Sequence, residues 1–214
     1  MKTLARGAIV AAAAMQAGCS TARTVETVSG GEVALVRPKA LELKHNMRRL
    51  WTDHVAWTRG YIVAAVANDP SASAQASRLM RNQEDIGNAV ATYYGSAAGA
   101  KLTDLLKQHI NIAVDLVTAA KAGDNAKVSD ADRRWHDNAR DIAAFLAGAN
   151  PNWSRDALVN MLNEHLSLTT EEALARIQKR WTDDTVAFDR ILTQALMMAD
   201  ALTDGIVKQF PSKV

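Results

Sequence analysis

Polar side chains interrupt the apolar stripes of this chain close to the midpoints of the helices that the pattern predicts. They are His54, Asn82, His109, Asn138 and Asp184. Imidazole nitrogens and carboxylate oxygens bind divalent transition metals, so His54, His109 and Asp184 form a candidate metal site. Alternatively, the five side chains bond to one another and fix the register of the helices, because a buried polar group is tolerated when it has a partner.

A second group of chemically active side chains is expected at one end of the same bundle. The group consists of His45, Tyr94, Trp153 and His165. We expect a short amphipathic helix to lie across this end. It would act either as a plug for the core or as the lid of a binding site.

The signatures of several enzyme classes are missing from the sequence. It contains no glycine-rich phosphate loop, no Gly-x-Ser-x-Gly elbow and no His-Glu-x-x-His motif. A single cysteine cannot build a disulfide framework or a cysteine zinc site. A ferritin-like di-iron centre requires two Glu-x-x-His motifs, and only residues 42–45 match. A divalent transition metal is therefore the one cofactor that the sequence suggests.

The elements that must position these side chains are helices. From Lys39 onward, apolar residues recur at spacings of three and four, and strict alternation is missing. Long helices are predicted over residues 40–67, 70–93, 97–122 and 128–147. After a turn, a short helix should begin at Ser154 and end near His165.

A last long helix is predicted to begin at a capping box. Thr169 is its expected N-cap, Glu172 lies three residues later, and the helix should run to about Val207. Short connections make successive helices antiparallel neighbours. We therefore predict an all-α fold, an up-and-down antiparallel bundle of about five long helices with one short helix near one end. We find no internal repeat after residue 38.

The N-terminal residues are typical of an exported protein. Lys2 and Arg6 precede an apolar run over residues 8–15, which is too short to cross a bilayer as a stable anchor. This arrangement of charge and apolar residues predicts a secretory signal peptide over residues 1–18.

The residues around Cys19 resemble the processing site of a bacterial lipoprotein. Ala17 and Gly18 are the small residues expected before a cysteine that is lipidated and becomes the mature N-terminus. Ser20 after the cysteine is typical of lipoproteins sorted to the outer membrane. Gln16 stands where an aliphatic residue is usual, so ordinary cleavage to give a soluble periplasmic protein is the alternative.

The predicted organisation has three parts. Residues 1–18 are the signal peptide, and residues 19–38 are rich in Ser, Thr, Val and Gly and form a flexible tether. Residues 39–211 form the helical bundle domain. This organisation predicts a bacterial envelope protein that is anchored by lipid and faces the periplasm.

Composition and charge restrict the partners of this protein. The 214-residue chain has 25 Lys and Arg residues against 23 Asp and Glu residues, and its net charge of +2 rests on the predicted signal peptide. Because the mature protein then has no broad basic field, we expect no nucleic-acid partner. The expected partners are the membrane, through the N-terminal lipid, and a small ligand or an envelope protein.

Several segments of the bundle resemble a family of uncharacterised exported bacterial helical proteins and lipoproteins. The segments are residues 54–59, 82–88, 105–110, 149–153 and 205–211. The resemblance covers roughly residues 45–211, and it implies the helical fold and its boundaries. Members often carry glycosyltransferase or acetylglutamate kinase labels. This sequence lacks the nucleotide-binding α/β pattern that those activities ordinarily bring, so the labels do not transfer.

Two functions are compatible with the sequence. The first is a non-enzymatic, envelope-anchored bundle that binds a small ligand, a metal or a partner protein. The alternative is a metal-dependent enzyme or metal-binding protein that uses the polar layer at the bundle waist. An enzyme needs an open coordination position and a route for its substrate, whereas a structural layer is closed and saturated by its own side chains.

Overall fold

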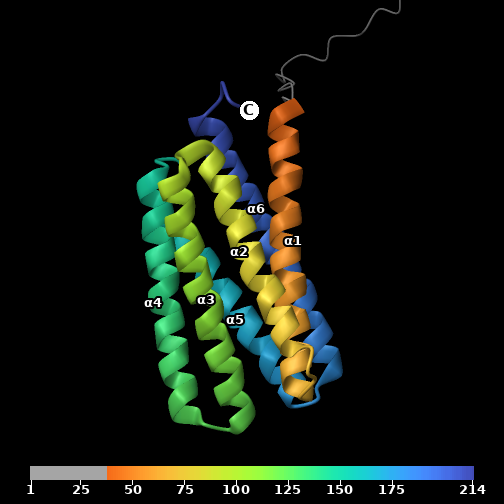
Figure 1. Ribbon diagram of the computed structural model, residues 1–214. Coiled ribbons are helices and arrows are strands. Elements are labelled where there is room, and N and C mark those ends of the chain that lie inside the picture. Colours follow the sequence, from red (N-terminus) through yellow and green to blue (C-terminus); the bar gives the residue numbers. More distant parts are fainter. Residues whose placement is uncertain (1–37) are drawn as a thin grey trace, which may run out of the picture. The chain divides into compact units, whose positions relative to one another are not determined.

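Helices make up nearly all of the folded chain, as the apolar spacing predicts. The computed structural model describes residues 38–214, and within them it has six helices and no strand (Figure 1). They are α1 (Pro38–Ala67), α2 (Ala72–Tyr94), α3 (Ser96–Ala122), α4 (Asn125–Ala149), α5 (Arg155–Ile177) and α6 (Trp181–Gln209). The predicted all-helical bundle is confirmed. The predicted signal peptide and Cys19 lie outside the described residues.

The six helices form three successive pairs around a shared core. Each helix packs against the next one along the chain, and α6 returns to pack against α1 (Figure 1). Contacts also join α1, α3 and α5 with one another, so the first helix of each pair is the inner one. Burial of an apolar stripe on every helix drives this packing.

The turn inside each pair uses the same backbone geometry. Asn68, Gly123 and Lys179 have φ angles of 57°, 72° and 59°, in the left-handed region. In each turn the next residue donates its N–H to the carbonyl five residues earlier, at 2.9, 3.0 and 2.9 Å. This bond satisfies a carbonyl at the end of the helix. The three positions follow one another at nearly equal intervals, so the chain contains an internal repeat that was not predicted from the sequence.

The last two helices differ from the prediction. Instead of ending after about three turns, α5 continues to Ile177, and with 23 residues it is as long as α2. Thr169 is not an N-cap, since its hydroxyl donates to the carbonyl four residues earlier within α5. Glu172 forms an ion pair with Arg59. The predicted break was misplaced because the true one, at Lys179, carries neither glycine nor proline.

The first four helices lie close to their predicted bounds. The largest difference is at the start of α4, which begins three residues before the predicted position. Asp124 explains the earlier start, because its side chain accepts a hydrogen bond from the backbone N–H of Lys127 at 3.1 Å and caps the helix.

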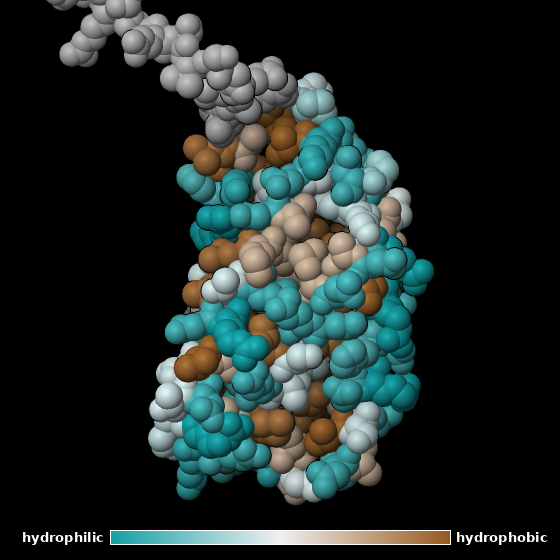
Figure 2. Space-filling view, turned by 180° about the vertical axis from the view of Figure 1, so that it is seen from behind, coloured by the Kyte–Doolittle hydropathy of each residue, from teal (hydrophilic) through white to brown (hydrophobic). Residues whose placement is uncertain are grey.

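The surface is mainly hydrophilic. On the face shown in Figure 2, hydrophobic residues form small patches separated by polar ones. The exposed large hydrophobic side chains of residues 38–214 are Leu41, Trp181, Val186 and Met197. None of the six helices has the length and apolar composition needed to cross a membrane.

Candidate functional site, a buried histidine layer

His109 on α3 shows how the polar layer is built. Its ring is buried, and Nδ1 lies 2.9 Å from Oδ1 of Asn138 on α4. The Asn138 amide nitrogen donates to the main-chain carbonyl of Leu105, one turn before His109, at 3.1 Å. The second bond fixes the orientation of the amide. Nδ1 of His109 is therefore the donor in the first bond, and Nε2 carries the lone pair.

The pair α5–α6 repeats this arrangement. Nδ1 of His165 lies 3.0 Å from Oε1 of Gln194, and the Gln194 amide nitrogen donates to the carbonyl of Met161 at 2.8 Å. Met161 again lies one turn before the histidine. By the same reasoning, Nδ1 of His165 donates and Nε2 carries the lone pair. The structure thus places His165 in the layer and not in the end site where it was predicted.

In the pair α1–α2, two neighbouring amides replace the single amide of the other pairs. One bonds to the main-chain carbonyl before the histidine, and the other contacts the histidine ring. Asn82 donates to the carbonyl of Leu50, one turn before His54, at 3.0 Å. Gln83 places its amide nitrogen 3.2 Å from Nδ1 of His54 and donates to the carbonyl of Leu79 at 2.8 Å. The same nitrogen donates to Oδ1 of Asn82 at 3.2 Å, so its two hydrogens are shared among three acceptors. Because an amide nitrogen can only donate, it is the donor in the contact with His54. Nδ1 of His54 is therefore the acceptor, and Nε2 carries the proton.

The three histidines occupy equivalent places in the three pairs. Each lies 29 residues before an amide side chain that it contacts. The intervals between the three histidines are the same as those between the three turns. The rings of His54 and His165 have centroids 5.7 Å apart, and all three rings line one internal cavity. Four of the five predicted waist residues are therefore brought into one layer.

Burial keeps these histidines neutral. Desolvation lowers the pKa of His109 to about 3, with a smaller contribution from the nearby His165. Desolvation followed by repulsion from the other two rings lowers the pKa of His54 well below its usual value, and burial also lowers the pKa of His165. All three rings are uncharged at neutral pH. The cavity between them has a volume of about 20 Å³, room for about one water molecule.

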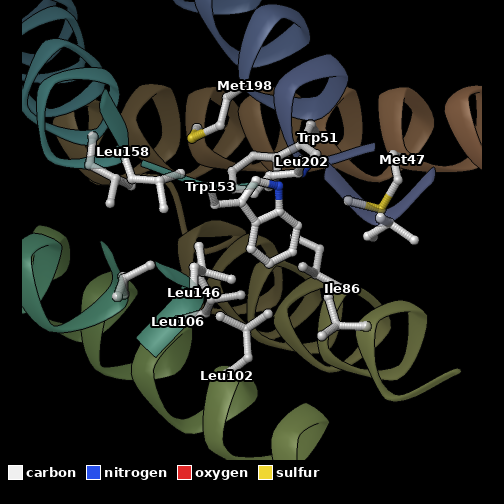
Figure 3. A pocket seen from close by; sticks show the side chains of 14 residues that line it. Met47, Trp51, Ile86, Leu102, Leu106, Leu146, Trp153, Leu158, Met198 and Leu202 are labelled. Atoms are coloured by element: carbon white, nitrogen blue, oxygen red, sulfur yellow. The ribbon is translucent and has the colours of Figure 1, made fainter. Parts of the chain in front are cut away.

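A second cavity lies one helical turn away in the apolar core. Its wall includes the residue that lies three positions before each histidine. These residues are Trp51, Leu106 and Leu162. Figure 3 shows the side chains of Trp51 and Trp153 crowded among the aliphatic residues at its centre. Its volume is also about 20 Å³. This space is a packed core, far smaller than the pockets that hold small ligands.

Asp184 does not belong to the layer. Its carboxylate accepts hydrogen bonds from Arg59 at 2.8 and 3.2 Å and from Arg176 at 3.1 Å. Glu172 accepts from the same Arg59 at 2.5 Å. Both carboxylates are buried, and the Arg59 guanidinium lies 4.7 Å from the centre of the Phe188 ring. We call these five residues the Arg59 cluster, which joins α1, α5 and α6.

The carboxylates of the Arg59 cluster are shielded from water. Burial raises the pKa of Glu172 to about 7, although the ion pair with Arg59 opposes the shift. Because Asp184 is held by two arginines, His54 and His109 lack their predicted third metal ligand. Within residues 38–214, no three His, Cys, Asp or Glu side chains are grouped so that they could hold a metal ion.

Only part of the predicted end site is assembled. The Tyr94 and Trp153 rings have centroids 5.7 Å apart. The Tyr94 hydroxyl accepts from Asn150 and donates to Gln209, both at 2.8 Å, and burial raises the pKa of Tyr94 to about 12. His45 is exposed on α1. Among residues 38–214, no short helix lies across this end. The predicted short helix is therefore wrong, and the contacts of Tyr94 join the ends of α2 and α6 to the turn after α4.

Three residues of the layer were not predicted from the sequence. They are Gln83, His165 and Gln194. The signal that identifies them is a histidine followed 29 residues later by Asn or Gln, which occurs three times at nearly equal intervals. It was hidden because the misplaced helix break put His165 in a separate element. The doubled amide in α2 also obscured the first copy.

Comparisons with known proteins give no relative. No family model matches the chain, and neither a curated protein nor a solved structure matches it.

Proposed function

We propose that this protein is a lipid-anchored component of the bacterial envelope that binds a partner protein at its surface. Cys19 would carry the lipid, and Ser20 favours the outer membrane. We further propose that the helices run up and down in antiparallel order, because successive helices pack against each other and α6 packs against α1. We also propose that residues 45–211 belong to the family of exported helical proteins that they resemble.

The closed interior favours a surface function over an enzyme that works at the waist. Each of the two internal cavities has a volume of about 20 Å³, which admits water but no substrate. The amide groups beside the histidines also bond to main-chain carbonyls, so they are occupied in holding helix pairs together. Recognition is therefore assigned to the exterior.

The groove between α5 and α6 is the surface that we assign to the partner. Val186 and Met197 lie on its rim and are 51% and 55% exposed, while Leu168 forms part of its buried floor. Val186 and Met197 are separated by about three helical turns, so they share one face of α6. The groove has a volume of about 370 Å³. Its exposed apolar rim is the observation that carries the proposal.

The charge of the groove defines the chemistry of the partner. Arg190 in the groove is already paired with Glu171 at 2.8 Å. Glu164 and Asp189 also line the groove, and neither has a basic partner among residues 38–214. Two unpaired carboxylates beside an apolar stripe are complementary to an amphipathic helix with Lys or Arg along its polar edge. We therefore propose a basic amphipathic segment of an envelope protein as the partner.

Photo-crosslinking in the native envelope tests this assignment. A photoreactive residue at Val186 or Met197 should give one discrete crosslinked species, because the partner segment lies on this rim. The same residue at Arg133, exposed on α4, is the control and should give none. The double variant Glu164→Gln/Asp189→Asn should weaken the crosslink at least several-fold. Equal labelling at all three positions, or none at any, would contradict the assignment.

Lipid anchoring is tested separately. Wild-type protein should incorporate labelled palmitate and fractionate with membranes, whereas Cys19→Ser should do neither. The variant should keep the fold, because the bundle begins about twenty residues later. A wild-type protein that stays unlabelled and soluble would show ordinary signal cleavage instead.

A further inference from the structure

Each ring of the histidine layer has one nitrogen that its helix pair leaves unpaired. In all three pairs the nitrogen next to the amide is Nδ1. The Nε2 atoms of His54, His109 and His165 have no hydrogen-bond partner among the residues that the structure describes. Each of these residues is only 3% exposed. Buried polar atoms nearly always have a partner, so one is expected in the cavity that the three rings share.

The surroundings of the layer give independent evidence for an additional polar group. Five other side-chain nitrogen or oxygen atoms within residues 38–214 are fully enclosed and also have no partner. Two of them are Nε1 of Trp135, which lines the cavity beside His109, and Oε1 of Gln83, whose amide nitrogen contacts His54. One unsatisfied atom therefore belongs to a residue that lines the cavity, and another belongs to the amide that contacts His54.

The three Nε2 atoms are not chemically equivalent. Gln83 occupies the same place as Asn138 and Gln194 in the other pairs, but it turns its amide nitrogen, not its oxygen, toward the ring. Because an amide nitrogen can only donate, Nδ1 of His54 is the acceptor. Nε2 of His54 is therefore an N–H donor. Nε2 of His109 and of His165 are lone-pair acceptors, since their Nδ1 atoms donate to amide oxygens. The cavity thus presents one donor and two acceptors.

A water molecule offers the matching set of one lone pair and two O–H groups. We propose that the cavity between His54, His109 and His165 binds a single water molecule. It accepts a hydrogen bond from Nε2–H of His54 and donates one to Nε2 of each of the other two rings. Three hydrogen bonds are what a buried water typically makes, and a volume of about 20 Å³ suits one such molecule.

The same groups are poorly suited to a transition metal. A metal ion needs a lone pair from every imidazole, and His54 presents an N–H to the cavity. The structure also has no cluster of metal-binding side chains within residues 38–214. The water has a structural role of its own. The Nδ1 bonds stay inside each helix pair, whereas a water bonded to all three rings connects the three pairs.

Imidazole tautomers measured by NMR on the full chain with ¹⁵N-labelled histidine test this proposal. We expect the Nδ1–H form for His109 and His165 and the Nε2–H form for His54, together with magnetisation transfer from one long-lived water to all three rings. His109→Phe keeps an aromatic ring but removes one acceptor, and it should abolish the transfer to the other two rings. His136→Phe is the matched control on α4 and should change nothing at the layer.

A second variant keeps the test decisive if His109→Phe does not fold. Gln83→Met preserves side-chain length and removes the donor to His54, so His54 should change to the Nδ1–H form. A high-resolution crystal structure should show one water within about 3.2 Å of each Nε2 atom. One shared tautomer for all three wild-type rings overturns the proposal. A stoichiometric metal in elemental analysis, or a cavity without water density, does so as well.

Discussion

The histidine layer and the Arg59 cluster bury polar groups in opposite ways. The layer consists of neutral rings and amides, and its His–amide contacts join residues 29 positions apart within one helix pair. The Arg59 cluster places charged groups beside the Phe188 ring, and the bonds of Arg59 to Glu172 and Asp184 join residues 113 and 125 positions apart. Neutral hydrogen bonds therefore align the two helices of a pair, while ion pairs join the first pair to the last.

The two regions also respond to pH with opposite signs. The histidine pKa values are lower in the folded protein, so the unfolded chain binds more protons once the pH falls below about 6.5, and stability is lost. The pKa of Glu172 is raised from 4.5 to about 7. In that window the folded protein binds the extra proton, so the contribution of Glu172 to stability grows as the pH falls.

Of the changes proposed here, acid should have the largest effect on the free energy of unfolding. Below pH 6.5, the free energy of unfolding should fall by up to about 1.4 kcal/mol per pH unit for each histidine, because the unfolded chain gains the protons. Urea unfolding at a series of pH values measures the slope. Glu172→Gln should steepen the loss between about pH 7 and 4.5. A flat profile from pH 7 to 4 would show that the histidines are not buried in the neutral form.

The next largest effect is expected from Arg59→Met. This change leaves Glu172 and Asp184 buried without their shared cation, and breaking a buried ion pair in this way costs about 3–5 kcal/mol. Urea unfolding at pH 7.5 measures the loss. Arg133→Met on the exposed face of α4 should stay within about 0.5 kcal/mol of wild type. Equal losses for the two variants would show that Arg59 contributes no more to stability than an exposed arginine.

Substitutions within the layer should cost less. His109→Leu and Asn138→Leu should each lower the free energy of unfolding by about 1–3 kcal/mol, since each leaves one buried partner unpaired. The double variant should lose less than the sum, because both partners of the bond are then removed. Strictly additive losses would indicate that the two side chains do not interact. Lys101→Ala, an exposed change on α3, serves as the control.

The smallest expected effect is at the turn between α5 and α6. Lys179→Gly should raise the free energy of unfolding by up to about 1 kcal/mol, because the left-handed conformation costs a residue with a side chain more than glycine. Gly123→Ala at the equivalent turn should lower it by a similar amount. The changes in melting temperature should be of opposite sign. If Lys179→Gly lowers the free energy of unfolding instead, the lysine side chain stabilises the fold by more than its left-handed backbone conformation destabilises it.

Much of the fold could be predicted because helical periodicity is a local property. The predicted polar interruptions His54, Asn82, His109 and Asn138 all belong to one buried layer. Asp184 fitted the same pattern but faces Arg59, because its position beside the start of α6 places it beyond the layer. Periodicity shows which face of a helix is buried and does not show its height along the bundle.

The break between α5 and α6 could not be predicted from local rules. Lys179 occupies a left-handed turn where Asn68 and Gly123, residues that favour this conformation, stand in the other pairs. Thr169 and Glu172 offered a better cap signal at the wrong place. Comparing the three pairs with each other would have found the turn, since the nearly constant interval between the turns does not depend on the residue type.

The packing of α6 against α1 has a consequence for how the chain folds. The contacts within a pair close short loops, whereas the hydrogen bond from Arg48 to Asp200 joins residues 152 positions apart. Loop-closure entropy makes such distant contacts the slowest to form. We therefore expect the three pairs to collapse early and independently, with docking of α6 on α1 as the rate-limiting event. Unfolding should then begin with the separation of α6 from α1, which would expose the Arg59 cluster to proteases before the His–amide bonds inside the pairs open.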